Sequence, residues 1–443
     1  MSVVRRIVTL LVSAFAIVAA SPAMAVEPVT VRYMMWDASQ LPAYRACAAD
    51  FERQNPDVRI RIGQAGWGDY WTAMTLGFIA GSAPDVFVNH LSKYPEFAAN
   101  GLLEDLSPLI ARDALDLGAF PPPLVQAWRR GAQQYGLPKD WDTVAMIVNL
   151  DHARAAGVSL DELRQMDWNP RDGGSFGRIV RRLTRDTAGR SAAEAGFDPR
   201  RVAMWGYQNP GAGGMTGQTE WSHFAASLGH RVQGAPWQLP LHYDDPRLAA
   251  TLDWLATLAP RGLSAPDALV RSLGAGALFV AGKAAIVPDG SWMIGYYAGA
   301  ARFETAWVPL PKGPDGRRAS MLNGLGDSMW VGSRVKPQAW RWMRHLASAA
   351  CQQRVAKDGV VFPARDGLAA QVVAQHRQRG VDAQAFLDMA AADTFLMPVA
   401  EHNARVDVIV KRQIESVLLG QQPAAPALKA AQQRVDAVLL PRR

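Results

Sequence analysis

The sequence contains 443 residues, of which 49% are hydrophobic and 20% are charged, and it carries a formal net charge of +7. This length exceeds what a single hydrophobic core usually organises, so we expect two domains. The basic excess is spread along the chain apart from four arginines, whose helical spacing is typical of a solvated helix face: Arg178, Arg181, Arg182 and Arg185. The charge distribution therefore argues against a nucleic-acid partner.

The first 25 residues have the three parts of an export signal. Two arginines precede an apolar run at residues 7–20, and Ala23-Met24-Ala25 provides the small residues that signal peptidase requires. The run is too short for a stable membrane anchor, and no cysteine follows that could carry a lipid. We predict a Sec signal peptide at residues 1–25, cleaved after Ala25, and no membrane-spanning segment in the rest of the chain.

Two cysteines, Cys47 and Cys351, lie far apart in the sequence. An oxidising compartment would permit a disulfide between them, but one pair does not make a disulfide scaffold. They could equally be small buried hydrophobic residues. The sequence leaves both interpretations open and gives no support for structural zinc.

The first part of the chain after the signal alternates between strand and helix patterns. These patterns predict strands at residues 29–35, 58–62 and 85–89, and helices at residues 41–55 and 71–80. Strands that alternate with helices form a parallel sheet covered on both faces. This region is therefore of the α/β class.

The rest of the chain repeats the alternation with shorter elements. We predict strands at residues 143–149, 284–287, 306–308 and 328–331, and helices at residues 248–258, 340–346 and, with a break at 420–426, 394–440. Ligands of open α/β sheets bind beyond the carboxyl ends of the strands. That rule points to Trp36 and Asp37, to residues 89–92, and to the loops after Val287 and Leu322.

Motifs that would indicate an enzyme are absent from the sequence. It has no H-E-x-x-H zinc helix, no C-x-x-C pair and no P-loop, so we expect no metal and no cofactor. Residues 211–217 resemble a dinucleotide-binding loop but carry Thr216 where the third glycine belongs, which favours a loop at the surface or at the edge of a cleft. Ser328 lacks the esterase elbow because Trp330 occupies its last position. We expect a protein that is not an enzyme.

Segments in order along nearly all of the chain beyond the signal resemble the extracellular solute-binding protein family that includes the maltose-binding type. They are FERQNPDV at 51–58, GSAPDVF at 81–87, AANGLLEDL at 98–106, YGLPKD at 135–140, FVAGKAA at 279–285 with GSW at 290–292, PLPKG at 309–313 with GS at 332–333, and GVVFPAR at 359–365. The segments at 168–176 and 217–221 resemble one branch of presumed sugar binders.

The resemblance implies a type II periplasmic-binding-protein-like fold, with two α/β lobes, a hinge and a ligand cleft between the lobes. On this basis we place lobe 1 at residues 26–136 and 311–350, and lobe 2 at residues 137–310 and 351–443. The resemblance also implies a monomeric periplasmic protein that captures a carbohydrate and docks onto the permease subunits of an ABC importer in the inner membrane.

A carbohydrate site needs flat aromatic faces for the C–H patches of the sugar and polar side chains for its hydroxyls. The sequence has 15 tryptophans, of which we expect most, including Trp71 and Trp340, to lie in the core. From strand ends and from the resemblance, we predict ligand contacts at these residues: Trp36, Asp37, Asn89, Asp140, Trp141, Glu220, Trp221, Asp289, Trp292, Gly324, Asp327 and Arg365.

Three other interpretations stay open at this point. The same fold could bind a glycerophosphodiester or a phosphorylated polyol, with Arg365, Ser291 and Ser328 as donors to phosphate. A periplasmic glycosidase could use a carboxylate pair hidden among Asp37, Asp140, Asp142 and Glu220. An adhesive module would bind insoluble polymer without a permease. Two changes from the family's pattern, at residues 147–149 and 324–326, leave the identity of the ligand open.

Overall fold

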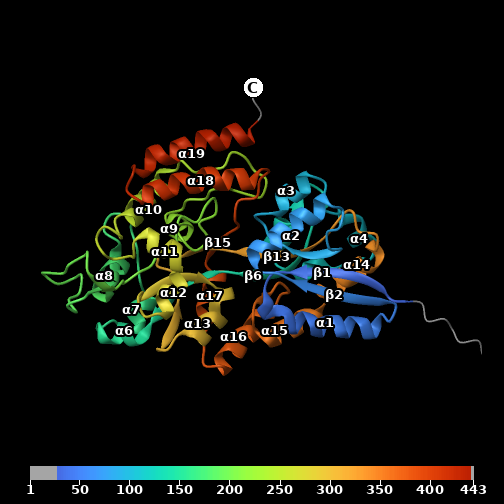
Figure 1. The fold of residues 1–443 in the computed structure, drawn as a ribbon, viewed down its shortest axis with the longest axis horizontal. Helices are drawn as coiled ribbons and strands as arrows, with labels where there is room; N and C mark the ends of the chain where they lie inside the picture. The colour runs from blue at the N-terminus through green and yellow to red at the C-terminus, as the bar shows by residue number, and fades with distance from the viewer. Residues whose placement is uncertain (1–26, 441–443) are drawn as a thin grey trace, which may run out of the picture.

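The computed structural model describes residues 27–440, so the predicted signal peptide lies outside the described residues. Two lobes lie side by side along the long axis of the molecule (Figure 1). Segments far apart in the sequence build each lobe: the lobe at the right of Figure 1 combines the blue N-terminal elements with orange elements near residue 340. We call this lobe 1 and the other lobe 2, as in the predicted two-lobed α/β arrangement.

Lobe 1 is built on one six-stranded sheet. Its strands are β1 (Val29–Met35), β2 (Val58–Gln64), β3 (Val86–Asn89), β6 (Leu137–Asp142), β13 (Asn323–Met329) and β14 (Phe362–Pro363). Their order is β14-β6-β13-β3-β1-β2. β1 runs parallel to β2 and β3, whereas β13 runs antiparallel to β3 and β6. The predicted parallel opening is therefore confirmed, and an antiparallel strand from late in the chain extends it.

Helices cover both faces of this sheet: α1 (Leu41–Gln54), α2 (Trp67–Ile79), α3 (Tyr94–Ala99), α4 (Ser107–Arg112), α5 (Pro122–Ala127), α14 (Lys336–Leu346), α15 (Ala349–Asp358) and α16 (Ala369–Gln378). In Figure 1, α2 and α3 lie above the sheet and α1 and α15 lie below it. α1 buries Tyr44, Ala48 and Phe51, whose spacing of three and four residues puts them on one helix face.

A disulfide joins Cys47 of α1 to Cys351 of α15, which decides between the two interpretations of the cysteines. Their Cα atoms are 5.3 Å apart, and 304 residues separate them in the sequence. Both side chains are buried in the core of lobe 1. The bond therefore links the N-terminal segment of lobe 1 covalently to its late segment.

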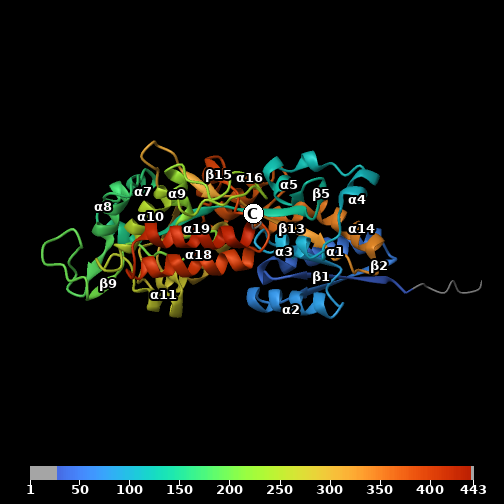
Figure 2. The ribbon, with the colours of Figure 1, turned by 90° about the horizontal axis from the view of Figure 1, so that it is seen from above.

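Lobe 2 contains a small antiparallel sheet of order β10-β7-β11, with β7 (Val144–Asn149) between β10 (Ile286–Gly290) and β11 (Thr305–Val308). Its helices are α6 (Leu150–Ala155), α7 (Leu160–Arg164), α8 (Gly174–Leu183), α9 (Ser222–Ser227), α10 (Pro246–Ala256), α11 (Asp267–Leu273), α12 (Ala275–Val280), α13 (Ile294–Ala300), α17 (Gln384–Ala390), α18 (Asn403–Leu418) and α19 (Ala424–Leu439). Figure 2 shows α18 and α19 side by side, with one end of the pair near the junction of the lobes.

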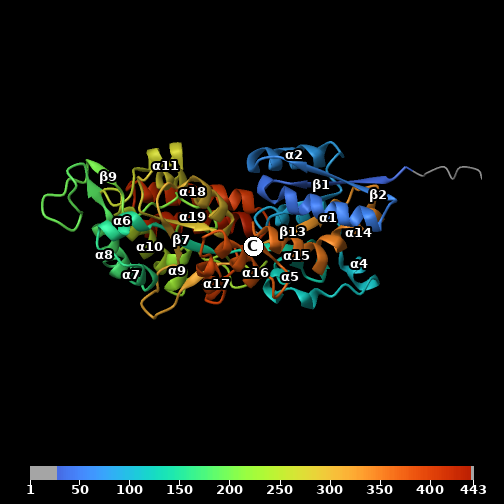
Figure 3. The same ribbon diagram turned by 90° about the horizontal axis from the view of Figure 1, so that it is seen from below.

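The chain passes between the lobes three times. β6 ends at Asp142 and β7 begins at Val144, so a single residue separates the strands of the two lobes. β12 (Ala319–Met321) precedes β13 by one residue and pairs in parallel with β15 (Asp393–Phe395). The third passage connects α16 to α17, and Figure 3 shows α15, α16 and α17 at the junction. These short passages are the natural hinge segments.

The contacts place the lobe boundaries differently from the predicted ones. Residues 137–142 and 362–363 form strands of the lobe 1 sheet, and α15 packs on α1, although the sequence-based division gave these segments to lobe 2. Residues 311–313 were given to lobe 1, but Lys312 bonds to the backbone of Met166 and Trp168 in lobe 2. The difference arises because a crossing strand continues from one lobe to the other without a turn, so no sequence pattern marks the boundary.

Among residues 27–440, no helix combines the length and the apolar character that crossing a bilayer requires. The core prediction for the two tryptophans is confirmed, since Trp71 is 9% exposed and Trp340 is 1% exposed.

Candidate ligand-binding site

A cavity of about 890 Å³ lies where the two lobes and the crossing segments meet. Lobe 1 contributes Trp36, Asp37, Ala38, Gln40, Gln64, Trp67, His90, Ser92 and Lys93; lobe 2 contributes Met215, Thr216, Gln218, Ser291, Trp292, Met293, Asn403, Ala404, Asp407 and Val408; and the crossing region contributes Asp140, Trp141, Asp142, Asn323, Leu325, Val361 and Met397. A cavity of this size matches small-molecule sites in other proteins.

Aromatic rings form the lobe 1 side of the cavity. Trp36 directly follows β1, and Trp67 is the first residue of α2. Their ring centroids are 5.1 Å apart and the ring planes are nearly perpendicular at 88°, while His90 lies 5.3 Å from Trp67. Trp67 is 47% exposed, so its ring is available to a ligand. On the lobe 2 side, Trp292 is 38% exposed.

A hydrogen-bonded chain of polar side chains runs beside Trp36. Asp37 caps the short helix η1 (Ala38–Gln40) by accepting the backbone N–H of Ser39, and its second oxygen accepts the side-chain amide of Gln40 at 2.9 Å. The carbonyl oxygen of the same amide accepts Lys139 Nζ at 2.6 Å. Lys139 in turn forms a buried ion pair with Asp140 at 2.5 Å.

The Lys139–Asp140 pair is almost fully buried, with side chains 1% and 2% exposed. Burial raises the pKa of the Asp140 carboxyl despite the lysine beside it. Burial alone would lower the pKa of Lys139, but Asp140, Tyr44 and Asp327 together outweigh that effect and raise it. Each charge therefore depends on the other, and removing one partner would strand a buried charge.

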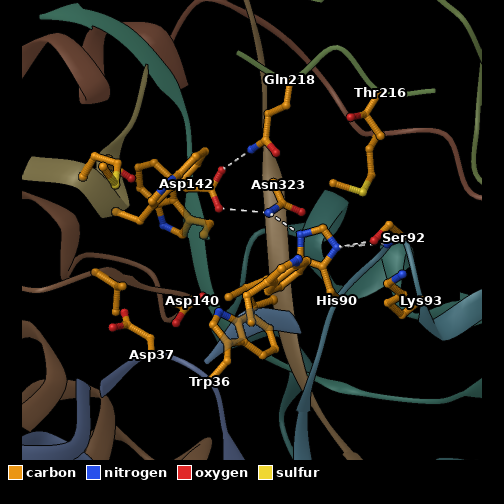
Figure 4. A pocket seen from close by; sticks show the side chains of 18 of the residues that line it. Trp36, Asp37, His90, Ser92, Lys93, Asp140, Asp142, Thr216, Gln218 and Asn323 are labelled. Atoms are coloured by element: carbon orange, nitrogen blue, oxygen red, sulfur yellow. Dashed lines mark hydrogen bonds between the residues drawn. The ribbon is translucent and has the colours of Figure 1, made fainter. Parts of the chain in front are cut away.

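A second network spans the floor of the cavity (Figure 4). Asp142 Oδ1 accepts the side-chain amide of Gln218 at 2.7 Å, and Asp142 Oδ2 accepts that of Asn323 at 3.0 Å. Asn323 also lies 3.3 Å from His90 Nε2, and His90 Nδ1 lies 2.8 Å from Ser92 Oγ. The network connects a lobe 2 loop, two crossing strands and the end of β3.

The titration of this network follows from its environment. Burial raises the pKa of the Asp142 carboxyl well above its usual range, and the two amide hydrogen bonds oppose this. Burial lowers the pKa of His90 to about 3, and the nearby positive charge of Lys93 acts in the same direction. His90 is therefore a neutral hydrogen-bonding group at any physiological pH.

The glycine-rich loop at residues 211–217 lies at the edge of the cavity, as one of the sequence interpretations had it. Gly214 has φ +57°, and a Cβ atom there would approach Asp407 Oδ1 to 2.0 Å. Glycine at this position therefore permits Met215 N to donate to Asp407 Oδ1 at 2.9 Å. This bond fixes the loop against α18 and leaves Met215, Thr216 and Gln218 on the cavity wall.

The cavity brings together a subset of the predicted site residues: Trp36, Asp37, Asp140, Trp141 and Trp292. Of these, Trp141 is only 9% exposed, because its ring stacks on Phe362 at 4.7 Å. Its contribution to the wall is therefore one edge of the indole.

The other predicted residues lie outside the cavity wall: Asn89, Glu220, Trp221, Asp289, Gly324, Asp327 and Arg365. Most of them are engaged in holding the scaffold. Trp221 is 1% exposed and donates to Ala212 O at 3.0 Å within the lobe 2 core. Asp327 accepts the hydroxyl of Tyr33 at 2.8 Å inside the lobe 1 sheet.

The remaining five also lie outside the cavity wall, in contact with scaffold residues. Asn89 donates to Ser328 Oγ at 3.1 Å, and Asp289 accepts the hydroxyl of Tyr297 at 2.7 Å. Glu220 accepts the backbone N–H of Thr219 at 3.1 Å, and a Cβ at Gly324 would collide with Leu124 at 2.7 Å. Arg365 lies with its guanidinium 5.9 Å from the ring of Phe120.

The predicted ligand contacts did not include several residues that line the cavity, among them Trp67, His90, Gln218, Asn323 and Asp407. Some had a usable signal: His90 lies in the strand-end segment 89–92, and Asn323 follows the loop after Leu322. Asp407 had none, because it comes from a helix at the far end of the chain. Within residues 27–440, no group of three or more His, Cys, Asp or Glu side chains is arranged to hold a metal ion.

Comparison with solved structures agrees with this architecture. The fold matches UspC of Mycobacterium tuberculosis with a TM-score of 0.73 at 23% identity, covering 92% of this chain and 100% of the other. It matches a substrate-binding protein of Listeria monocytogenes, solved in complex with cycloalternan, with a TM-score of 0.78 at 19% identity, covering 93% and 99%. The fold is therefore the type II periplasmic-binding-protein fold.

Sequence comparison finds relatives over shorter stretches. A maltotriose-binding protein of Pyrococcus abyssi is 30% identical over 128 residues, which is 29% of this chain and 27% of that protein. An arabinooligosaccharide-binding protein of Bacillus subtilis is 25% identical over 173 residues, 38% of each chain. The chain thus spans about a third of the length of the curated relatives it matches. The model of the bacterial extracellular solute-binding protein family matches residues 37–353, and the chain belongs to that family.

Proposed function

We propose that this protein is the substrate-binding component of an ABC importer and that it captures a carbohydrate in the cavity between its lobes. The observation that supports this most directly is the composition of the cavity wall. Tryptophan rings from both lobes face it, and carboxylate and amide side chains surround them.

This composition suits a sugar for a physical reason. Each sugar ring has a face of C–H groups, which an indole ring covers while it excludes water. The hydroxyls at the rim need hydrogen-bond partners, and carboxylates and amides offer the stronger ones. The names of the two curated relatives, which describe oligosaccharide binding, point to the same class of ligand.

Capture and release follow from the position of the cavity. A ligand that contacts both Trp36 and Trp292 gains interactions only while the lobes are close together, so binding shifts the population toward the closed form. The hinge segments between β6 and β7 and between β12 and β13 are short enough to absorb the rotation. In this proposal the chain is exported by the Sec pathway and is monomeric in the periplasm, and its closed form docks onto the permease.

The cavity favours this function over the alternatives. A phosphate ligand needs converging cationic donors, but Lys93 is the one lysine or arginine among the described lining residues, and Arg365 lies outside the cavity wall. A glycosidase needs two available carboxyl groups. Of the four carboxyl groups considered for such a pair, Asp140 is held by Lys139, both oxygens of Asp142 accept amide hydrogen bonds, and Glu220 lies outside the cavity wall. Asp37 is left without a second available carboxyl group from that set. We therefore propose binding without catalysis.

Calorimetry of the mature protein against a panel of neutral mono- and oligosaccharides, with glycerophosphodiesters as the comparison set, tests the proposal. We expect a saccharide to bind and X-ray scattering to show compaction when it is added. Tight binding of a phosphodiester with no saccharide binding would contradict the proposed ligand class. Turnover of a chromogenic glycoside that is lost in Asp142→Asn would contradict the absence of catalysis.

A further inference from the structure

The hydrogen-bonding groups of the cavity are unevenly distributed between donors and acceptors. The side-chain NH₂ groups of four amides that line it all donate to protein oxygens: Gln40 to Asp37, Gln64 to the Trp36 carbonyl at 2.8 Å, Gln218 to Asp142, and Asn323 to Asp142. Carboxylate and carbonyl oxygens only accept, so the orientation of each amide is determined by its partner.

This arrangement leaves acceptors available for a ligand. Asn323 is 3% exposed and its Oδ1 is buried with no hydrogen-bond partner among the described residues, although the residue lines the cavity. Figure 4 shows the Oδ1 side of Asn323 turned away from Asp142. A buried oxygen without a donor is costly unless a ligand or water satisfies it. The site therefore calls for a ligand that donates.

The charges of the cavity point in the same direction. In the described part of the chain, no lysine or arginine forms an ion pair with Asp37, Asp142 or Asp407, whereas Asp140 is neutralised by Lys139. Lys93 is the one lysine or arginine among the described lining residues, and its Nζ lies 5.8 Å from the centre of the Trp71 ring. Burial raises the pKa of the Asp142 carboxyl, so Asp142 is left out of the charge comparison. Asp37 and Asp407 still outnumber Lys93.

The aromatic wall suits a cation as well as a sugar ring. Trp36 and Trp67 meet at nearly a right angle, so together they present two indole surfaces in one corner of the cavity. The face of an indole ring attracts an ammonium group through its quadrupole, and the attraction grows as water is excluded.

From these observations we infer that the cavity selects a saccharide carrying a protonated amine, with Asp37 and Asp407 as the specificity-determining carboxylates. An ammonium group offers three N–H donors and no acceptor, which matches the surplus of oxygens and of negative charge. The inference rests on the proposed carbohydrate-binding function and narrows its ligand class. A sugar with a phosphate or carboxylate group is disfavoured by the same charges.

Two matched ligand sets test it by calorimetry at low salt. One contains cellotriose, the glucosamine trimer and the corresponding glucuronic acid trimer; the other contains maltotriose, 6-amino-6-deoxymaltotriose and its 6-carboxylate. We expect the amine to bind about tenfold more tightly than the neutral sugar of its set, because a charge-assisted hydrogen bond replaces a neutral one. The carboxylate should bind most weakly.

Isosteric variants then connect the preference to its residues. Asp407→Asn and Asp37→Asn should each reduce the amine-to-neutral affinity ratio severalfold, and asparagine keeps the capping role of Asp37. Asp244→Asn removes an exposed carboxylate that does not line the cavity and is the matched control, with an unchanged ratio.

The outcomes separate the inference from the function on which it rests. Equal or weaker binding of the amine in the set that binds, or a ratio unchanged in both cavity variants, overturns the amine preference and leaves the carbohydrate function intact. If no member of either set binds, and the neutral saccharide panel also fails, both are overturned.

Discussion

The two lobes contribute to the cavity in different ways. On the lobe 1 side, Trp36 follows a sheet strand and packs against three other aromatic residues and the ring of His90, with Tyr70 and Trp71 behind it. On the lobe 2 side, Trp292 comes from the short helix η3 (Ser291–Met293), and no other aromatic ring of the described residues packs on it. Its ring instead folds back over Gly290, where a Cβ would lie 1.9 Å away.

Because of this difference, we expect the two walls to play different parts in ligand binding. Rings and carboxylates that are already packed and hydrogen-bonded lose little freedom when a ligand arrives, so the lobe 1 wall is preorganised. In the lobe 2 wall the glycine-rich loop is bonded to α18, but Trp292 comes from a short helix and has no aromatic partner among the described residues, so this indole can adapt as the lobes close. Substitutions in the lobe 1 wall should therefore affect both stability and affinity, and substitution of Trp292 in the lobe 2 wall should affect mainly affinity.

The largest expected effect comes from removing the covalent link of lobe 1. Replacing both Cys47 and Cys351 with serine should lower the free energy of unfolding by about 4 kcal/mol, because the disulfide closes a long loop in the unfolded chain. Urea unfolding under oxidising conditions measures this. Ligand affinity of the folded variant should change little, since both residues lie outside the cavity wall.

Hydrogen exchange locates the effect within the molecule. In the double variant we expect faster exchange in β1 and α1, and unchanged exchange in β7 and α10 of lobe 2. Wild-type protein with a reducing agent should behave as the variant does. Equal loss of protection in both lobes would contradict the view that lobe 1 is the separately stiffened half.

Trp36→Ala should affect stability and binding together. Truncating a packed indole is expected to cost about 3 kcal/mol of unfolding free energy, because Tyr70 and Trp71 lose a neighbour. Binding should weaken in addition, since the ring also lines the cavity. Trp36→Phe, which keeps part of the ring, should recover part of both losses. A variant of unchanged stability would show that Trp36 is not part of a packed wall.

Trp292→Ala tests the opposite side. The affinity for a saccharide should fall by about 1–3 kcal/mol if the indole stacks on it. The unfolding free energy should change less than in Trp36→Ala, because Trp292 is 38% exposed and no other aromatic ring of the described residues packs on it. Tyr296→Ala, on the adjacent helix and 40% exposed but outside the cavity wall, is the matched control. Equal affinity losses in the two variants would remove Trp292 from the site.

How far the sequence predicts the molecule depends on how local the signal is. The alternation of residues 29–89 predicted the first three strands and the helices between them, because hydrophobic periodicity is a local property. The strand-end rule pointed to Trp36 and Asp37, and both residues line the cavity. β14 and α15, by contrast, join the lobe 1 sheet and α1 from late in the chain, and only tertiary contacts place them there.

The site shows the same limit at the scale of one residue. Asn89 was predicted to contact the ligand, but its neighbour His90 lines the cavity instead. Successive side chains at a strand end point in different directions, so Asn89 turns into the sheet layer toward Ser328 while His90 turns out. Asp407 illustrates a different limit, because nothing near it in the sequence connects α18 with Trp36.

The smallest expected effect concerns His90, which links the rigid wall to the crossing strands. Its pKa is lowered to about 3 in the folded protein, first by burial and second by Lys93, whereas an unfolded histidine titrates near about 6.5. Below pH 6.5 the unfolded chain therefore binds a proton that the folded one does not, and stability falls as the pH decreases toward 3. His90→Gln cannot take up this proton, and glutamine retains the capacity to hydrogen-bond Asn323.

Comparing wild type with His90→Gln at pH 7 and at pH 5 separates the contribution of His90 from that of the other titrating groups. Between these pH values, wild type should lose about 1 kcal/mol more unfolding free energy than His90→Gln. This loss is smaller than the full pKa difference would give, because His90 is partly open to the cavity. Urea unfolding at each pH measures the difference, and an NMR titration of the imidazole should show no protonation above about pH 5. A variant that loses as much stability as wild type would mean that His90 is solvated like a surface residue. The lobe 1 wall would then be open to water at His90, and it would not be the more tightly packed of the two walls.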